Sequence, residues 1–164
     1  MKEKAKFQKE GVKTSDNSGN GECKTDLAGD CTTNNDCKEE GKYCKIEGKL
    51  ENECSIPTKG TCTALDNGTS TTYKEKTFFY SSSYMSWWAA RNWCLKHGKN
   101  LVSLSDLSCT TSGCEDWDGL IKGVESHYYW TNNSKDSCYA FIVGANRRRV
   151  YGNNHTFNGH VLCR

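Results

Sequence analysis

The sequence predicts an α+β protein with two helices and small antiparallel sheets, preceded by a small disulfide-rich module. Of the 18 aromatic residues, 15 lie in residues 77–164, whereas residues 1–76 hold 13 of the 17 lysines. Six of the 11 cysteines lie in residues 23–62. Because buried apolar area is the main driving force of folding, the second half can build a conventional core and the first half cannot.

The first half divides into two parts. Residues 1–22 are mostly Lys, Glu, Gly, Ser and Asn, and they predict a flexible leader. Residues 23–62 carry cysteines at 23, 31, 37, 44, 54 and 62. A segment this short with few apolar groups folds only with covalent or metal staples. Six cysteines allow 15 disulfide pairings, and the sequence does not choose among them. Zinc is disfavoured, because no CxxC pair occurs and no histidine precedes His97.

The second half begins after a Thr-, Gly- and Asn-rich stretch, 63–76, that predicts a linker or an edge segment, and the second domain is placed at 70–164. Helix periodicity and helix formers favour a helix over 85–97, with the serines at 81–83 as its cap region and Gly98 as its end. A second short helix is expected over 117–124. Aromatic and β-branched runs predict strands over 76–80, 100–104, 127–131, 137–143, 148–151 and 160–163.

Composition and motifs exclude several functions. No apolar run reaches the ~18 residues of a membrane span, and the net charge of +2 is too small for a nucleic-acid footprint. No phosphate loop or nucleophile elbow occurs. The acidic run 115–118 is typical of a helix start. We therefore predict no enzyme activity, no cofactor and no bound metal. The cysteine content indicates an oxidising compartment, although no secretory signal follows Met1.

An ordered set of motifs in the second half resembles the C-type lectin fold. The matching segments are Ala89-Ala-Arg-Asn-Trp-Cys94, Gly98-Lys-Asn-Leu-Val-Ser-Leu104 and Val161-Leu-Cys163. The tail, with Tyr129-Trp-Thr131 and Cys138-Tyr-Ala-Phe-Ile-Val143, looks more specifically like bacterial members of the fold, which include surface adhesins, pilin-tip-like proteins and the hypervariable proteins of diversity-generating retroelements. The resemblance implies a compact C-type-lectin-like domain with a long-range disulfide between Cys94 and Cys163.

The sequence departs from that family where its members bind calcium. Their sugar site needs a proline-bearing carboxylate loop, but the only proline is Pro57, outside the matching region. Calcium takes six to eight oxygen ligands, normally several of them from carboxylates. After residue 118 only Glu125 and Asp136 are acidic. We therefore expect any ligand binding to be independent of calcium.

The remaining cysteines leave a choice open. Cys109 and Cys114 can close a small loop together. Since 11 cysteines cannot all pair within one chain, at least one is left over. Cys138 is the preferred odd cysteine, and a pair between Cys109 and Cys138 is the rival arrangement.

The best functional signal is the Tyr-, Asn- and Ser-rich composition of the tail, since evolved binding surfaces use these residue types. Strand alternation places Tyr139 on the opposite side from Ala140, which we expect to face the first helix. The arginines at 147–149 either keep a hairpin tip soluble or contact an acidic glycan. The candidate ligand-binding residues, expected on one surface, are Asn132, Asn133, Ser134, Tyr139, Arg147, Tyr151, Asn153 and His155.

These observations predict an exported ligand-recognition protein, such as an adhesin or receptor-binding head at the cell surface, whose tail fits the pattern of the diversified members of the family. Its partner would be a protein or glycan on another cell or surface, with no nucleic acid and no membrane span. The alternative is a structural minor pilin-like subunit whose head packs against other pilus subunits.

Overall fold

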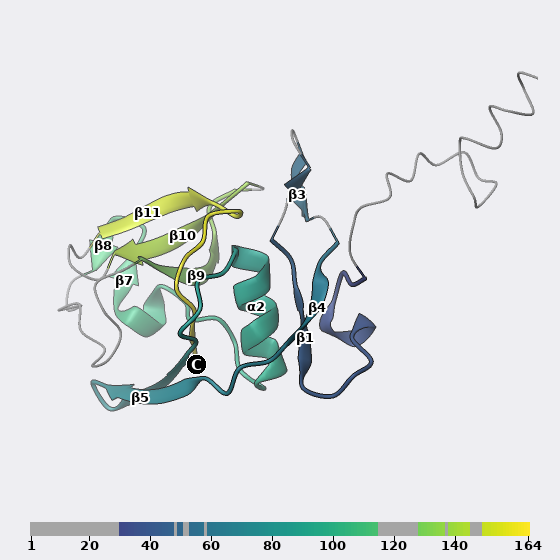
Figure 1. The fold of residues 1–164 in the computed structure, drawn as a ribbon. Helices are drawn as coiled ribbons and strands as arrows, with labels where there is room; N and C mark the ends of the chain where they lie inside the picture. The colour runs from purple at the N-terminus through teal and green to yellow at the C-terminus, as the bar shows by residue number, and fades with distance from the viewer. Residues whose placement is uncertain are drawn as a thin grey trace, which may run out of the picture.

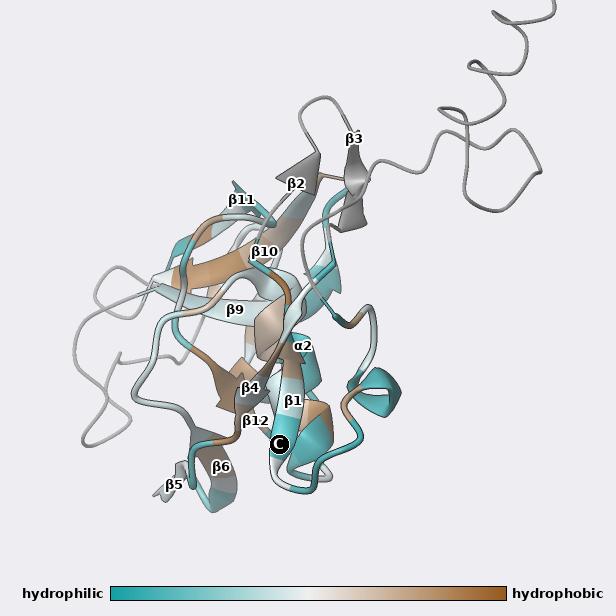
Figure 2. Ribbon diagram, turned by 45° about the vertical axis from the view of Figure 1, so that its right-hand side comes forward, coloured by the Kyte–Doolittle hydropathy of each residue, from teal (hydrophilic) through white to brown (hydrophobic). Residues whose placement is uncertain are grey.

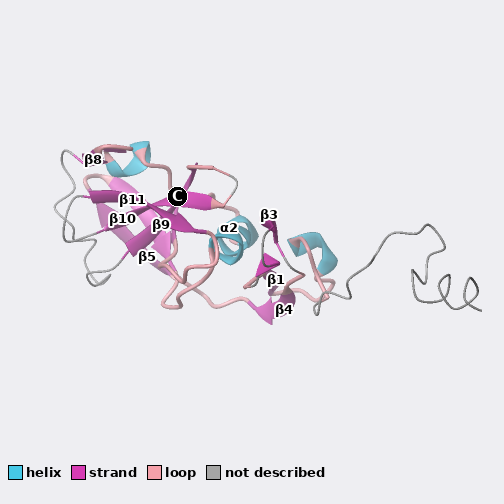
Figure 3. Cartoon of the chain, turned by 90° about the horizontal axis from the view of Figure 1, so that it is seen from above, coloured by secondary structure: helices cyan, strands magenta, loops and turns pink. Residues whose placement is uncertain are grey.

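A computed structural model describes residues 30–47, 49–50, 53–57, 59–114, 128–136, 138–144 and 149–164. One α-helix, α2 (Trp87–Lys96), lies at the centre of the described part. A three-stranded sheet lies on one side of α2, and a pair of strands from the cysteine-rich module lies on the other, as two views show (Figures 1 and 3). The helix is therefore the element that both halves of the chain contact.

The central sheet has the order β11-β10-β9 and is antiparallel throughout. Its strands are β9 (Tyr128–Ser134), β10 (Tyr139–Gly144) and β11 (Arg149–Asn154). β10 is the most hydrophobic of the three (Figure 2). Ala140 and Ile142 are buried in the same core cluster as α2, as the alternation predicts. Val143, on the other side of β10, is buried in a second core cluster. Both faces of the middle strand are thus packed.

A second sheet has the order β12-β6-β5 and joins the C-terminus to the start of this region. It consists of β5 (Thr69–Tyr73), β6 (Lys76–Tyr80) and β12 (Leu162–Cys163). Two residues with positive φ, Lys74 and Glu75, turn the chain between β5 and β6. The sequence predicted a linker or an edge segment where β5 lies, and β5 is an edge strand of this sheet. Its threonines form a strand because they are β-branched and pair with the aromatic strand β6.

Small elements close the second core cluster. They are a bridge at Leu101, the 3-10 turn η2 (Ser105–Leu107), and the short strands β7 (Cys109–Thr110) and β8 (Gly113–Cys114). Their apolar side chains meet those of β6, β9, β10 and β12. The buried members of the second cluster are Phe78, Val102, Leu104, Leu107, Cys109, Cys114, Tyr129, Val143 and Leu162.

The cysteine-rich module is built on one antiparallel pair, β1 (Lys42–Lys45) with β4 (Thr61–Ala64). A 3-10 turn, η1 (Asn34–Asp36), precedes this pair. A hairpin of β2 (Lys49–Leu50) and β3 (Glu53–Pro57) lies between its strands in the sequence. Two disulfides fasten the turn region to the strands: Cys31–Cys44 and Cys37–Cys62.

The module packs directly on α2. Tyr43, Cys44 and Ile46 belong to the same buried cluster as the tryptophans of the helix. Asn92 Nδ2 donates to the Cys44 carbonyl at 3.0 Å, and Asn34 Nδ2 donates to the Asn92 carbonyl at 2.7 Å. The regions expected as separate domains at 23–62 and 70–164 therefore share a core.

The helix itself begins at an N-cap serine. Ser86 Oγ accepts a hydrogen bond from the Ala89 amide at 3.2 Å and donates one to the Ile46 carbonyl of the module. The expected cap region, 81–83, lies a few residues too early. Gly98, with a φ of 69°, follows the C-cap His97, in a conformation that favours glycine.

The predicted fold class is wrong. The described residues form mostly small antiparallel sheets around one α-helix, not a two-helix α+β lectin arrangement. The polar, threonine-rich segment 69–73 forms a strand because it pairs with the aromatic strand β6. The cysteine-rich module adds strands of its own. The second predicted helix, 117–124, lies outside the described residues. No helix in the described part of the chain is long and apolar enough to cross a membrane.

The disulfides correct one further expectation. Cys94 is bonded to Cys163 and Cys109 to Cys114, the pairs named from the sequence. Cys138, however, is not the odd cysteine, because it is disulfide-bonded. It does not bond Cys109 either, since Cys109 is already paired. Multiple disulfides indicate an oxidising environment.

Candidate functional site

The face of the central sheet that looks toward α2 carries two rows of neighbouring side chains. Residues directly opposite each other in antiparallel strands share a face. Gly144 is opposite both Tyr128 and Arg149, and Ile142 is opposite both Trp130 and Tyr151. The row of Trp130, Ile142 and Tyr151 is largely covered by α2. In the row of Tyr128, Gly144 and Arg149, the two side chains are exposed, so this row extends the packed face to the surface.

Three aromatic rings gather at that exposed end, and we call Tyr128, Tyr151 and Phe157 the aromatic face. The Tyr128 ring centroid lies 6.0 Å from that of Tyr151 and 6.4 Å from that of Phe157, in edge-to-face contacts. Phe157 also contacts the buried Trp130 at 6.0 Å. Tyr128 is 41% exposed and Phe157 is 37% exposed. Edge-to-face packing holds the rings in place, so they form a preorganised apolar surface.

Gly144 makes room for the aromatic face. A Cβ atom at this position would lie 3.1 Å from Cε1 of Tyr128 and 3.6 Å from Cε2 of Tyr151. The first distance is tight, so a side chain at position 144 would require the Tyr128 ring to shift by a few tenths of an ångström, whereas the second is an ordinary contact. Glycine in a strand commonly marks such a close approach of another group.

The other end of the sheet carries the asparagines singled out from the sequence. The register of β9 against β10 shifts between Ala140 and Ile142, so Asn132 and Asn133 bulge out of the ladder. Both are exposed, as is Ser134. Asn133 Oδ1 accepts a hydrogen bond from the Leu104 amide at 2.8 Å, which ties the bulge to the neighbouring loop. Part of this polar surface therefore has a structural role.

The turn after the bulge positions Tyr139. Asp136 Oδ1 accepts hydrogen bonds from the amides of Cys138 and Tyr139 at 2.8 and 2.9 Å. The ammonium of Lys135 lies 5.7 Å from the centre of the Tyr139 ring, a cation–π contact. The ring is 40% exposed. This end is thus a rigid, mixed aromatic and polar turn.

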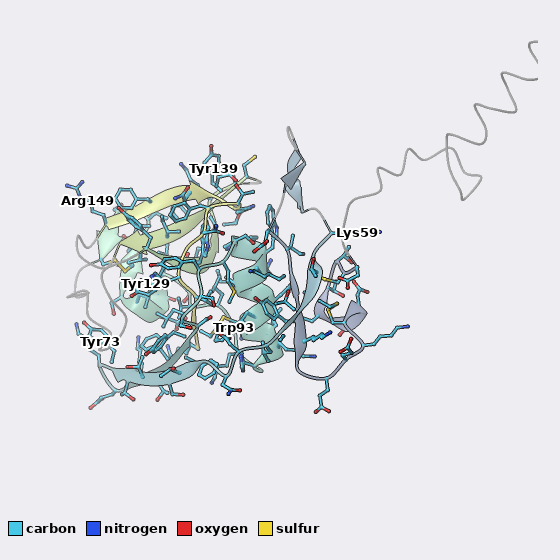
Figure 4. The ribbon with its side chains drawn as sticks, in the orientation of Figure 1. Lys59, Tyr73, Trp93, Tyr129, Tyr139 and Arg149 are labelled. Carbon is cyan, nitrogen blue, oxygen red and sulfur yellow. A yellow bond between two sulfur atoms is a disulfide. The ribbon has the colours of Figure 1, made fainter. Side chains whose placement is uncertain are left out.

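The structure does not bring all the candidate residues onto one surface. Tyr139 is opposite Asn154, whereas Tyr151 is opposite Ile142, so the two tyrosines point to opposite faces of the β10–β11 hairpin. Asn153 shares the face of Tyr151. Figure 4 also shows Tyr139 and Arg149 at opposite ends of that hairpin.

Two further candidate ligand-binding residues, His155 and Arg147, are not found on the described surface of the sheet. His155 is only 4% exposed and its ring stacks on Trp87, with 4.3 Å between centroids. It also meets the edge of Trp88 at 5.0 Å. His155 therefore lies within the core beside α2, where a ligand cannot reach it. Arg147 lies outside the described residues.

Sequence reasoning left Tyr128 and Phe157 out of the candidate set. The available signal for Tyr128 was its position at the start of a strand two residues before Trp130, which puts both on one face. For Phe157 the signal was weaker: it is an isolated large apolar residue among the Asn, Thr and Gly residues of 152–159. Neither pattern reveals that the rings meet, because the contact depends on the loop that follows β11.

Burial or hydrogen bonding shifts the pKa values of four described ionisable groups: Asp36, Tyr43, Asp106 and Tyr129. Burial raises the pKa values of Tyr43 and Tyr129 well above the usual value for tyrosine. Hydrogen bonds from the amides and hydroxyls of Thr32 and Thr33 lower the pKa of Asp36 to about 2. Among the described residues, the one group of potential metal ligands is Cys31, Cys37 and Cys62, whose sulfurs are all in disulfides.

Comparisons with known proteins add no family. No protein-family description matches the chain. No curated protein matches it either. The likeness to C-type lectins therefore stays a prediction from sequence.

Proposed function

We propose that this chain is an extracellular ligand-recognition protein that binds its ligand without calcium through the aromatic face. The observation that carries the proposal is the cluster of Tyr128, Tyr151 and Phe157, two of them more than one-third exposed, beside the close approach at Gly144. Tyrosine and phenylalanine offer large contact areas with few rotatable bonds, so binding costs them little conformational entropy.

The surroundings of the aromatic face supply polar contacts. Arg149 lies opposite Gly144, on the same side of the sheet as the Tyr128 ring. In the described part of the chain no carboxylate forms an ion pair with Arg149. Its guanidinium can therefore donate to acceptor oxygens of a ligand whose apolar side rests on the rings. Peptides and glycans both present such a combination.

The environment of the protein supports an external role. The disulfides fit an oxidising compartment. A displayed protein that must keep its shape outside the cell needs a binding surface on a rigid scaffold. The aromatic face meets that need, since Tyr128 and Tyr151 sit on strands whose other face is packed in the second core cluster.

Ligand arrays test the proposal. The purified chain is screened on glycan and protein arrays, with and without EDTA, and the hits are measured in solution. We expect Tyr151→Ala to weaken binding by about 2 kcal/mol or more, because binding hot spots favour tyrosines in partly desolvated patches. EDTA should leave both the binding and the melting temperature unchanged.

The control is Tyr139→Ala, which alters a tyrosine of nearly the same exposure as Tyr128 that points to the opposite face. It should leave binding nearly intact. A Gly144→Ala variant adds one methyl group against the Tyr128 ring and should weaken binding without unfolding the protein. If Tyr151→Ala and Gly144→Ala both bind normally, the aromatic face is scaffold. If the chain binds no ligand but assembles with copies of a pilus subunit, the aromatic face is an assembly contact instead.

A further inference from the structure

We propose that the ligand of the aromatic face is an extended, acidic peptide segment of a partner protein, which pairs with the outer edge of β11 as a fourth strand of the central sheet. This inference rests on the function proposed above and names the ligand. β11 is the outer strand of that sheet (Figure 1). In the paired arrangement an acidic side chain of the peptide lies beside Arg149 and an apolar one beside Tyr151.

The hydrogen bonds between β10 and β11 show which backbone groups of β11 are used inside the sheet. The His155 amide donates to the Cys138 carbonyl at 3.0 Å, which continues the ladder of the two strands by one residue. Hydrogen-bonded and non-hydrogen-bonded pairs alternate along antiparallel strands. The residues of β11 whose backbone groups bond to β10 are therefore Arg149, Tyr151 and Asn153.

The alternate residues of β11, Val150 and Gly152, point their backbone N–H and C=O groups away from β10. In the described part of the chain these groups have no hydrogen-bond partner. Asn154, the next outward residue, is satisfied locally. Its amide donates to Asn153 Oδ1 and its carbonyl accepts from the Phe157 amide, both at 2.9 Å. The open edge thus presents two donors and two acceptors, the groups that an added strand pairs with.

The opposite edge of the same sheet is closed by the body of the protein. In β9 the Trp130 amide donates to the His160 carbonyl at 3.1 Å, and the Asn132 amide donates to the Val102 carbonyl at 2.7 Å. Proteins commonly cover or blunt an exposed edge strand, because unpaired backbone groups recruit other chains. The described residues cover the β9 edge in this way and leave the β11 edge open, which fits an edge that is kept for a partner.

The side chains along the open edge suit an apolar residue followed by an acidic one. A fourth strand would place its side chains beside those of β11, and neighbours on one face interact. Beside Tyr151, an apolar side chain would extend the row of rings formed with Tyr128, which lie 6.0 Å apart between centroids. Beside Arg149, two residues along, a carboxylate would accept from the guanidinium.

The other face of the edge also carries a positive charge. A Cβ atom at Gly152 would lie 2.5 Å from Cδ and 3.0 Å from Nζ of Lys135, so the lysine side chain lies across this glycine. The sequence of residues 127–164 holds five lysines and arginines and a single acidic side chain, Asp136. The Asp136 carboxylate accepts from two backbone amides of its own turn. The edge therefore attracts an acidic partner, whereas a second copy of this chain would bring the same positive charge.

The backbone pattern favours a peptide over an acidic glycan. A glycan could meet Arg149 and the rings, but it has no use for the outward groups of Val150 and Gly152. Those groups repeat at two-residue spacing, about 7 Å along the strand, and an extended polypeptide repeats its own donors and acceptors at the same interval.

Peptide selection on the oxidised full chain tests the proposal. The probe is a phage-displayed library of linear ten-residue peptides, with a glycan array as the parallel arm. We expect the enriched peptides to carry an acidic residue two positions from an aromatic or aliphatic one. An N-methyl scan of one selected peptide should weaken binding at alternate residues only, because the amides of a paired strand alternate between its two edges.

Two variants at one position test the edge from the side of the protein. Val150→Pro removes the outward N–H, and an edge strand tolerates proline where the N–H faces outward. Val150→Ala is the matched control, because it shortens the same side chain but keeps the N–H. We expect Val150→Pro to bind the selected peptide at least about 10-fold more weakly than Val150→Ala, since an unpaired polar group is left in the interface. Circular dichroism checks that both variants are folded.

The possible results separate this proposal from the function on which it rests. Equal binding by the two folded Val150 variants, or an N-methyl scan without alternation, would overturn strand pairing. If Val150→Pro does not fold, the N-methyl scan decides alone. Glycan binding without any enriched peptide would overturn the peptide ligand but leave the proposed function standing, provided that Tyr151→Ala weakens the glycan. Self-association that Val150→Pro abolishes would also overturn it, since the edge would then pair with a second copy.

Discussion

The module (residues 30–64) and the C-terminal body (residues 65–164) contact the same helix but are stabilised differently. The body has an entire core cluster of its own, under η2, β7 and β8. The described buried side chains of the module all belong to the cluster that includes α2. In its described part the module therefore has no separate core, and the disulfides Cys31–Cys44 and Cys37–Cys62 replace the apolar area that its sequence lacks. A cysteine-rich stretch beside an aromatic-rich one need not be an independent domain.

The strongest way to separate the two regions is reduction of the disulfides. The few apolar residues of the module cannot offset an ordering entropy of about 1–2 kcal/mol per residue once the disulfides are gone. We expect a reductant to unfold the module first. Proteolysis should then cut within 30–64 before it cuts the body. A chelator alone should change nothing in the oxidised protein.

Removing the long-range disulfide should lower the free energy of unfolding of both regions together. Cys94 lies on α2 and Cys163 on β12, and their bridge spans 69 residues of sequence. In the chain-entropy model a loop of that size contributes about 4 kcal/mol. The double variant Cys94→Ser with Cys163→Ser should lose roughly that much unfolding free energy in denaturant. The five-residue Cys109–Cys114 loop should contribute about 2 kcal/mol by the same relation. Peptide mapping that found Cys94 bonded elsewhere would contradict this account.

A matched pair of core substitutions sharpens the comparison. Ile46 of the module and Ile142 of the body are each 2% exposed and lie in the same cluster. Truncating a buried isoleucine to alanine costs about 2–5 kcal/mol. We expect Ile46→Ala and Ile142→Ala to shift one common unfolding transition by similar amounts. A separate early transition in Ile46→Ala alone would show that the module unfolds by itself.

Acid should have the smallest effect, and it should begin locally in the module. Four hydrogen bonds from Thr32 and Thr33 lower the pKa of Asp36 from 3.8 to about 2, because they stabilise the carboxylate. Because this pKa is depressed, the Asp36 carboxylate stabilises the folded state at pH values above the pKa of the unfolded chain, near 4. The stabilisation is lost as the pH falls through about 2. NMR shifts of the Thr32 and Thr33 amides should follow that titration. In Asp36→Asn they should not respond to pH in this window.

The carboxyl of Asp106 offers a comparison in the body. Although burial opposes the shift, hydrogen bonds from Ser103 and the ion pair with Arg164 lower its pKa. The sign is therefore the same: acid removes the stabilisation. Since the Arg164 side chain is partly exposed, Asp106→Asn should cost no more than about 1 kcal/mol.

Local elements were predictable from sequence where side chains carry a clear pattern. The helix around Trp93, the strand at 76–80 and the hairpin of β10 and β11 all lie close to the expected ranges. The fold class was not predictable, because weak strands such as β5 form only through their partners. The shared core could not be foreseen either. Nothing in residues 42–46 indicates that Tyr43 and Ile46 pack on a helix more than 40 residues away.

The candidate site could likewise be predicted from the sequence only in part. Alternation correctly put Ala140 and Ile142 toward α2 and left Tyr139 outside. It could not place Tyr139 and Tyr151 relative to each other, since their faces depend on the register of the hairpin. His155, chosen as a surface residue, is buried because two tryptophans of α2 enclose its ring.

Amide hydrogen exchange on the oxidised chain tests most directly whether the module and the body form one cooperative unit around α2. The Cys44 amide, bonded to Asn34 Oδ1, reports on the module, and the Val102 amide, bonded to the Leu162 carbonyl, reports on the body. Exchange through a shared unfolding event gives both amides the same opening free energy. We predict equal values, with the same decrease for both amides in Ile46→Ala. A module amide that opens with a clearly lower free energy than the body amide would contradict the shared core.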